Sequence, residues 1–406
     1  MKIQGDRADV WIPAAVWRDA AAIFVAVFAA YSATMIAFGH FGTSPVSYFD
    51  LLAWSFIHGR TDLIDPKATA DLAHYHGLWY VPFPPLPALL MLPGISVLGP
   101  DRFNVGTFVA AAGAAAASGV YLLLQQLGGL GITRLTRGDN RLLALAFAFG
   151  TINWYMATTS NVWYVAQVST YLFAIVALVC VAGGASPVWA GIALGLAVMG
   201  RPHIVAMLPL IIALRIARDK VCPARWVVTL LAPVSVAAVV LALYNLARFG
   251  APGEFGYRYA LGHDWVARDF LQYGQFSTHF LLRNTYTMFL ELPRWNPHVS
   301  FWTPRLDGMS IALTMPFGLW VVWARSEWPP LARAAWASVA LGLCPPLLYY
   351  APMMQFGARY FLDVMPAVVV LVALAVAQGV TRSFRVAVAL SMIVNAAGTI
   401  WWHWPR

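Results

Sequence analysis

Long apolar blocks alternate with short polar segments along the whole chain. Several blocks run for about 18 residues or more with almost no charge, which is the length that an α-helix needs to cross a bilayer. The pattern predicts a polytopic, all-α membrane protein with two larger outer loops that carry short interfacial helices. The eleven predicted spans cover residues 20–39, 103–127, 142–159, 166–183, 187–200, 203–219, 226–247, 309–324, 331–351, 361–379 and 385–402, and the fifth and sixth are short or interrupted.

The segment 81–98 is also apolar, but it contains five prolines: Pro82, Pro84, Pro85, Pro87 and Pro93. Proline removes a backbone donor and breaks a helix. If this segment crossed the membrane, every later loop would change sides, and the basic loops 128–141 and 215–226 would face outward. We therefore predict that it is interfacial or re-entrant and sheltered by other parts of the protein.

Charge decides the orientation of these spans. Only 11% of the residues are charged, against about 25% in an average soluble domain. The predicted inner segments hold 14 of the 26 Lys and Arg but only 6 of the 17 acidic residues; they are 1–19, 128–141, 184–186, 215–226, 325–334 and 380–385. Because basic residues are retained in short cytoplasmic loops, we predict a cytoplasmic N-terminus and an extracytoplasmic C-terminus in an inner or plasma membrane. The net charge of +9 then requires no nucleic acid partner.

The outer side carries the polar residues that could do chemistry. Two large outer segments follow from the predicted spans, residues 41–102 and 248–307. We expect one integrated membrane domain, in which residues 1–247 form the catalytic module with the first outer loop. Residues 248–406 then supply the second outer loop and the C-terminal helices.

Asp50 is the first candidate catalytic residue. It lies in SYFDLLAWSFIHGR, whose apolar spacing predicts a short amphipathic helix at the membrane surface. A carboxylate among aromatic side chains is partly desolvated, which raises its pKa and suits a general base. The alternative is a carboxylate that only stabilises the N-terminus of a helix.

Arg201 and Arg359 are candidate ligands of a phosphate. Arg201 lies at the end of a short span, in VMGRPHIVAMLP, and Arg359 precedes another span, in MMQFGARYFLDVMP. An arginine at membrane depth requires an anionic partner, and a lipid phosphate would fit. Alternatively, Arg201 extends to the headgroups without a specific ligand. For Asp363 we favour pairing with Arg359 four residues earlier on one helix face over a catalytic role.

Further outer residues are candidates for contacts with a substrate: His58, Arg60, His74, His76, Tyr80 and Arg258. His74 and His76 form a His-x-His pair, which by itself is a weak metal signal. Histidines in such loops more often form local hydrogen bonds. The chain contains no Walker A loop, no GxSxG, no HExxH and no dinucleotide-binding fingerprint.

The order of these features resembles the GT-C fold glycosyltransferases, which include protein mannosyltransferases, the aminoarabinose transferase of lipid A and RgtA/B/C/D-like bacterial enzymes. The matching residues are Asp50 after the first span, Pro84-Pro85-Leu86 near the end of the first outer loop, and Arg201-Pro202 after the fifth span. The phrases RFGAPGEFGY and QFGARYFLDVMP are similar to segments of bacterial members. The resemblance covers most of the chain in topology, although each motif is short.

The resemblance implies a polyprenyl-phosphate sugar as donor and a lipid or glycan as acceptor, within a membrane lipid environment. Asp50 would deprotonate the acceptor hydroxyl, and Arg201 would bind the leaving phosphate. Arg359 as a second phosphate ligand follows from its position. Because Asp50 stands alone rather than in an acidic pair, a mechanism without a cofactor is favoured over one that uses a divalent metal. A transporter or flippase with discontinuous helices at 187–200 and 203–219 remains the rival.

Overall fold

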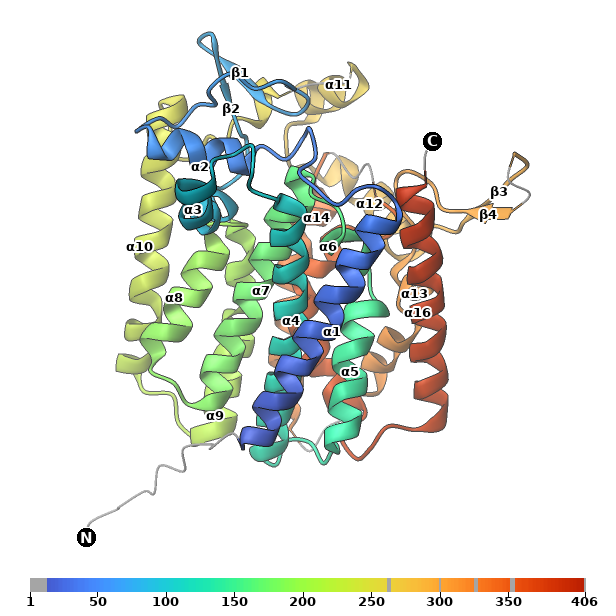
Figure 1. Ribbon diagram of the computed structural model, residues 1–406. Coiled ribbons are helices and arrows are strands. Elements are labelled where there is room, and N and C mark those ends of the chain that lie inside the picture. Colours follow the sequence, from blue (N-terminus) through green and yellow to red (C-terminus); the bar gives the residue numbers. More distant parts are fainter. Residues whose placement is uncertain (1–12, 261–263, 299–300, 325–327, 351–354, 405–406) are drawn as a thin grey trace.

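The protein is a bundle of helices with its connecting loops gathered at two opposite ends (Figure 1). The structure, a computed structural model, describes residues 13–260, 264–298, 301–324, 328–350 and 355–404. Six helices in the described part of the chain are long and apolar enough to cross a membrane: α1 (Ala14–Ala37), α4 (Val105–Gly129), α7 (Val162–Gly183), α10 (Ala224–Phe249), α14 (Pro329–Leu348) and α16 (Arg382–His403). The all-α, multi-pass membrane architecture expected from the sequence is confirmed.

Shorter helices occupy the remaining predicted spans. Prolines and glycines interrupt these segments, so that each becomes two short elements or one helix of fewer than 18 residues. They are α5 (Arg137–Phe149) with α6 (Asn153–Ala157), α8 (Pro187–Val198), η1 (Pro202–Met207) with α9 (Leu208–Asp219), α13 (Ile311–Thr314) with η4 (Pro316–Trp323), and η5 (Arg359–Val364) with α15 (Met365–Ala375); the elements marked η are 3-10 helices.

The two outer segments form a cap of short elements above one end of the bundle (Figure 1). The first contains α2 (Phe49–Ile57), the hairpin β1 (Ala73–Tyr75) and β2 (Leu78–Tyr80), and α3 (Leu86–Leu98). The second contains η2 (Tyr257–Tyr259), α11 (Asp264–Tyr273), η3 (Thr278–Phe280), α12 (Leu281–Phe289) and the hairpin β3 (Arg294–Asn296) and β4 (Phe301–Thr303).

The proline-rich segment forms α3 beside α2 within this cap. Pro85 is its N-cap, Pro87 lies in its first turn and Pro93 lies inside it. Thirteen residues at about 1.5 Å per residue are too short for a hydrocarbon core of about 30 Å. The interfacial position expected from the prolines therefore agrees with the length and place of α3.

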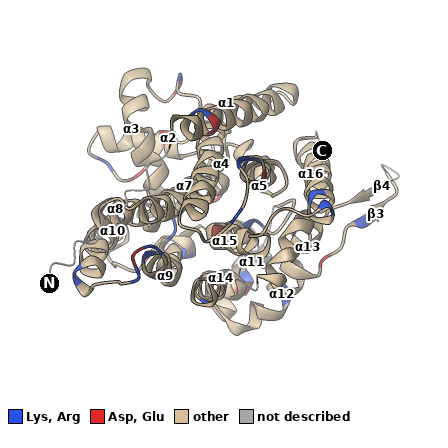
Figure 2. Ribbon diagram, turned by 90° about the horizontal axis from the view of Figure 1, so that it is seen from below, with Lys and Arg blue, Asp and Glu red and all other residues tan. Residues whose placement is uncertain are grey.

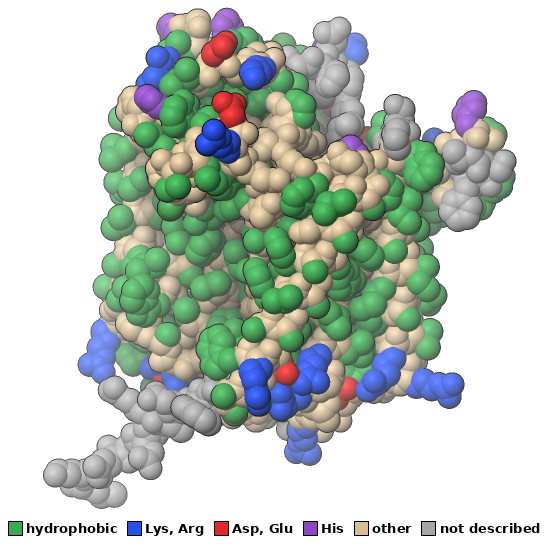
Figure 3. All heavy atoms as spheres, viewed as in Figure 1, with side chains coloured by type: hydrophobic (Ala, Val, Ile, Leu, Met, Phe, Trp, Pro, Cys, Tyr) green, Lys and Arg blue, Asp and Glu red, His purple; other side chains and the backbone are tan. Residues whose placement is uncertain are grey.

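The opposite end of the bundle is basic (Figures 2 and 3). Asp19 of α1 forms ion pairs with Arg137 at 2.5 Å and Arg141 at 2.6 Å, both on α5. Asp139 of α5 pairs with Arg385 of α16 at 2.9 Å. These pairs join three helices at one end, while a belt of apolar side chains covers the bundle above them (Figure 3). α1 begins at this basic end and α16 finishes at the other (Figure 1). Which end faces the cytoplasm stays a prediction from the positive-inside rule.

Candidate functional site

A buried ionic cluster lies just inside the capped end of the bundle. Asp363 of η5 has a fully buried side chain, and its carboxylate contacts Arg201 Nη1 at 3.0 Å and His203 Nε2 at 3.0 Å. Gln167 Nε2 donates to the same carboxylate at 2.8 Å and to the carbonyl of Arg359 at 2.6 Å. Gln167 lies five residues into α7, so the cluster is about 8 Å below the start of that helix. Side chains from α7, η1 and η5 thus hold one another in a fixed arrangement.

The sequence around Arg201 explains how this arginine reaches the cluster. α8 ends at Val198, and Pro202 then begins η1. A residue that precedes proline is restricted to extended backbone, and Arg201 has φ −148° and ψ 108°. Gly200 packs so closely against Thr170 that a Cβ would collide with the threonine hydroxyl. The Gly-Arg-Pro sequence therefore ends the helix and sends the Arg201 side chain across to η5.

The expected pairing of Asp363 with Arg359 is wrong. It assumed an α-helix, in which residues four apart lie on one face. Residues 359–364 instead form a 3-10 helix, in which residues three apart are eclipsed, and Asp363 turns toward Arg201 and His203.

Arg359 is left with a buried charge that no carboxylate neutralises among the described residues. Its residue is 6% exposed, and its guanidinium lies over the rings of Tyr360, Tyr164 and Trp163 at 4.9, 5.7 and 6.0 Å from their centroids. Nη2 donates to the Tyr360 hydroxyl at 3.1 Å, but Nε and Nη1 have no hydrogen-bond partner in the described part of the chain. A buried donor without a partner costs free energy, and a buried charge costs more. The guanidinium therefore keeps a positive charge and two donors that no described group satisfies.

The two arginines come together at one aromatic ring. Arg201 lies 5.4 Å from the centroid of Tyr360, the same ring that Arg359 covers. Ring contacts continue outward from Tyr360 to Tyr349 at 5.9 Å, from Tyr349 to Tyr257 at 6.2 Å, and from Tyr257 to Phe83 at 5.8 Å. Phe83 belongs to the first outer segment and Tyr257 to the second, so both segments converge above the arginines.

The pKa of the Tyr257 hydroxyl reflects its burial and the charges of the arginines around it. Burial raises the pKa of its hydroxyl to about 12, and the positive charge of Arg201, followed by Arg248 and Arg359, opposes part of that rise. The outer wall of the site is therefore a phenol that stays protonated at neutral pH and can donate a hydrogen bond.

Asp50 is more buried than the sequence suggested. It lies in the first turn of α2 and is 5% exposed, and its Oδ1 has no hydrogen-bond partner among the described residues. Burial raises the pKa of the carboxyl, while the Ser47 hydroxyl and the backbone amides of Asp50 and Leu51 lower it by less. Tyr48, the N-cap of α2 two residues before Asp50, has φ +61°, a conformation that is strained for an aromatic residue and of a kind that clusters at functional sites.

Asp50 belongs to a different part of the outer face from the ionic cluster. It forms no ion pair with either arginine in the part of the chain that the structure describes. Two contacts connect its neighbourhood to the cluster: the amide of Leu86, at the start of α3, donates to the carbonyl of Met199 at 3.1 Å, and the amide of Val162 donates to the carbonyl of Val46 at 3.0 Å. The loop that precedes α2 is thus tied to the outer start of α7.

The remaining candidates make local contacts in the cap. Arg60 pairs with Asp62, and Arg258 pairs with Glu254 at 2.6 Å. His58 Nδ1 contacts the carbonyl of Trp54 at 2.9 Å. His74 and His76 are exposed on the β1–β2 hairpin, and Tyr80 is buried against Phe249 at 5.3 Å between centroids. None of these six side chains contacts Arg201, Arg359 or Asp363 among the described residues. Within those residues, no three His, Cys, Asp or Glu side chains are grouped to hold a metal ion.

Two residues of the site, His203 and Gln167, were not singled out from the sequence. His203 stands two positions after Arg201, and Gln167 is a polar residue inside a span, which is a functional signal by default. Arg248, in the last turn of α10, donates to the carbonyl of Val81 at 2.6 Å and to Asn245 Oδ1 at 2.7 Å. It therefore anchors the proline-rich segment to the bundle.

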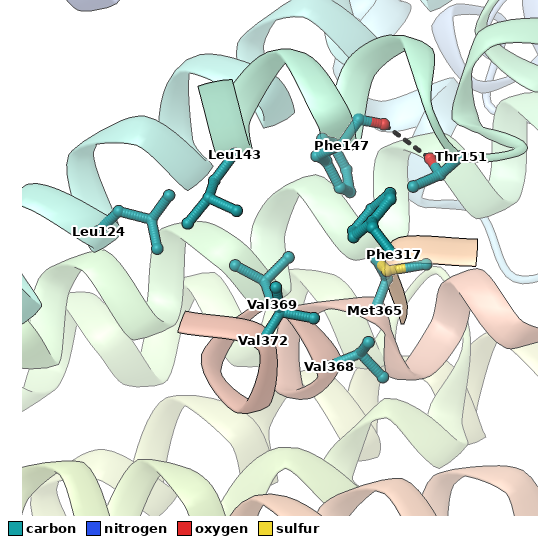
Figure 4. A pocket seen from close by; sticks show the side chains of 9 residues that line it. All are labelled: Leu124, Leu143, Phe147, Thr151, Phe317, Met365, Val368, Val369 and Val372. Carbon is teal, nitrogen blue, oxygen red and sulfur yellow. Dashed lines mark hydrogen bonds between the residues drawn. The ribbon is translucent and has the colours of Figure 1, made fainter. Parts of the chain in front are cut away.

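Two cavities lie outside the ionic cluster in the described part of the chain. The first is small and apolar, and it lies between α4, α5, η4 and α15 (Figure 4). Its one polar lining residue, Thr151, is already bonded to the carbonyl of Phe147 at 2.6 Å. A small apolar cavity of this kind is typical of a packing defect and not of a binding site. The second cavity, of about 730 Å³, opens at the capped end between α1, the α6–α7 turn and α16.

Comparisons with known proteins give a structural likeness at low identity. No protein-family model matches the chain, and no curated protein matches it. Two structures of the Archaeoglobus fulgidus oligosaccharyltransferase are similar. One is the apo form, with 17% identity, a TM-score of 0.43, and coverage of 95% of this chain and 55% of that one. The other is AglB in complex with an inhibitory peptide and a dolichol-phosphate, with 15% identity, a TM-score of 0.44, and coverage of 94% and 56%. The chain thus spans little more than half the length of the structures it resembles.

Proposed function

We propose that this chain is a membrane glycosyltransferase that moves a sugar from a polyprenyl-phosphate donor to a lipid or glycan acceptor at the extracytoplasmic face. The observation that carries the proposal is the buried side chain of Arg359. Among the described residues no carboxylate compensates its charge, and two of its guanidinium nitrogens have no partner. A phosphate monoester would accept from both nitrogens and supply the missing negative charge.

Arg201 differs from Arg359 in that Asp363 already neutralises it. In the proposed reaction it is a secondary ligand, because a guanidinium has five donors and one nitrogen is committed to the carboxylate. His203 and Gln167 hold the Asp363 carboxylate in place. The ion pair with this carboxylate in turn keeps Arg201 directed toward Tyr360. The site would therefore bind phosphate through the uncompensated charge of Arg359 and through Arg201, whose charge is paired with Asp363.

The proposed chemistry is a single displacement at the anomeric carbon. A hydroxyl oxygen of the acceptor forms the new bond to this carbon, and the bond from the carbon to the phosphate oxygen breaks on the opposite face, with inversion. Asp50 takes the hydroxyl proton, and the raised pKa of its buried carboxyl makes it a stronger base. The leaving phosphate retains the electron pair of the broken bond, and Arg359 stabilises the charge that develops on it.

Incubation of the purified chain in lipid nanodiscs with a panel of polyprenyl-phosphate sugars tests the proposal. We expect consumption of one donor and release of the polyprenyl phosphate, both abolished in Asp50→Asn and Arg359→Met. The matched control is Arg102→Met, which removes an exposed arginine from the outer side. Failure to bind any polyprenyl phosphate, together with no consumption of any donor, would refute the proposal.

A further inference from the structure

The large cavity at the capped end is distinct from the arginine site. Three segments that are far apart in the sequence line it: residues 38–45 after α1, residues 158–161 between α6 and α7, and residues 402–404 at the end of α16. The ends of α1 and α16 and the short α6 lie in the same region of Figure 1. The volume of about 730 Å³ falls within the usual range of small-molecule sites, about 300–1,000 Å³.

The lining of this cavity is polar but uncharged. It contains no Lys, Arg, Asp or Glu among the described residues; its polar side chains are His40, Thr43, Ser44, Thr158, Thr159, Ser160, Asn161 and His403. His403 is buried, and its Nε2 contacts Thr158 Oγ1 at 3.0 Å. A cavity without fixed charge offers no counter-ion to a phosphate or a carboxylate, so its ligand should be neutral.

The hydrogen-bonding groups in the lining favour a ligand with many hydroxyls. Thr159 and Ser160 donate their own hydroxyl protons to the carbonyls of Tyr155 at 2.7 Å and Gly42 at 3.0 Å. The Ser160 oxygen already accepts from the Ser44 amide at 3.0 Å, whereas the Thr159 oxygen accepts no hydrogen bond among the described residues and is left as an acceptor for a ligand. Asn161, the half-buried residue before α7, makes no side-chain capping bond to the helix, which leaves its amide for a ligand.

Aromatic faces complete the cavity. Phe38, Phe41, Trp402 and Trp404 line it, and Trp404 is 63% exposed at its rim. Aromatic rings combine a flat apolar face with polar surroundings, as the apolar faces of sugar rings require. Trp402 also contacts Tyr164 at 5.6 Å between centroids. The guanidinium of Arg359 lies 5.7 Å from the centroid of the same Tyr164 ring. Two aromatic rings, Trp402 and Tyr164, thus connect the cavity wall to the buried arginine.

Asp50 follows the cavity wall after a short stretch of chain. Pro45, the last lining residue of the first segment, precedes Asp50 by five residues. Five residues span at most about 18 Å even when fully extended. Asp50, the proposed base, therefore lies within this distance of the cavity wall.

We infer that this cavity binds a neutral carbohydrate, and that it receives the glycan portion of the acceptor. The second part rests on the proposed glycosyl transfer, whereas the first part rests only on the cavity. Binding here would place the acceptor glycan beside Trp402, whose ring contacts lead through Tyr164 to Arg359.

Saturation-transfer NMR on the full chain in nanodiscs tests the carbohydrate site without any donor. The probes are uncharged methyl glycosides and disaccharides, compared with the matching hexuronates. We expect the neutral sugars to bind and Asn161→Phe, which fills the cavity, to weaken binding about tenfold or more. Thr159→Val, a milder change that removes one acceptor, should weaken it by a smaller factor. Gln272→Phe adds the same ring to an exposed position on α11, outside the cavity, and should leave binding unchanged.

Each result distinguishes the two parts of the inference. Absence of saccharide binding, or equal binding in wild type and Asn161→Phe, overturns the carbohydrate site. Polyprenyl-phosphate binding shows that Asn161→Phe is folded, since Arg359 is untouched. If transfer proceeds in Asn161→Phe with an unchanged KM for acceptor, the acceptor assignment is wrong. If saccharide binds as expected but no donor is ever consumed, the proposed transfer fails while the carbohydrate site stands.

Discussion

Replacing Arg359 with methionine separates a phosphate ligand from a structural arginine. Two nitrogens of this side chain, Nε and Nη1, have no partner in the part of the chain that the structure describes and are available to a phosphate. A hydrogen bond to a charged group contributes about 1.5–3 kcal/mol, so two of them contribute about 3–6 kcal/mol. We therefore expect Arg359→Met to weaken binding of a polyprenyl phosphate by about 10²- to 10⁴-fold.

The same substitution should leave the unliganded protein as stable as the wild type, within about 1 kcal/mol. Methionine retains the apolar volume beneath Tyr360 and removes a buried charge that no described carboxylate neutralises. The lost cation–π contacts offset part of that gain. Arg201→Met provides the contrast, because it leaves the buried Asp363 carboxylate without its arginine and should cost about 3–5 kcal/mol.

The assay is titration of short-chain polyprenyl phosphate into nanodisc-embedded protein, paired with thermal unfolding of the same samples without ligand. Arg359→Lys should restore binding only partly, because an ammonium lacks the planar fork of a guanidinium. Arg102→Met should match the wild type in both measurements. If Arg359→Met binds the phosphate normally and unfolds at a much lower temperature, Arg359 is a structural residue and the reasoning is refuted.

Three further predictions concern other residues. Asp50→Asn should reduce transfer by about 10²- to 10⁴-fold with unchanged phosphate binding. Because burial raises the pKa of this carboxyl, the wild-type transfer rate should rise with pH as the carboxyl deprotonates. For the same reason the unfolding midpoint of Asp50→Asn should not fall below that of the wild type. A wild-type rate in Asp50→Asn would exclude Asp50 as the general base and make His58, His74 and His76 the next candidates. Asp363→Asn should lower the free energy of unfolding by several kcal/mol, measured by denaturant titration, since Arg201 then loses its partner; an unchanged value would contradict the structural role of this pair. In a variant without native cysteines, Arg134→Cys should resist an impermeant thiol reagent applied to intact cells while Gln272→Cys reacts; the reverse labelling would invert the predicted orientation.

The sequence by itself determined the membrane class, the positions of the long apolar helices and the two long connecting segments. These depend on local properties: apolar length, proline content and the placement of basic residues. The break at Gly200-Arg201-Pro202 was also readable, because a residue before proline is driven to extended backbone wherever it occurs. The same local reasoning found Asp50, Arg201 and Arg359 as candidates, since ionisable residues at span boundaries are costly unless they are used.

Only the tertiary structure decided how these residues are paired. Arg201 and Asp363 are 162 positions apart, and local spacing instead suggested the pair of Asp363 with Arg359. The 3-10 geometry of η5 turned Asp363 toward Arg201 and left Arg359 uncompensated, which is the feature that most favours a phosphate. The cavity likewise exists only because residues 38–45, 158–161 and 402–404 meet at the outer ends of three helices. Periodicity and propensity act over a few residues, whereas charge compensation and enclosed volume depend on which distant segments pack together.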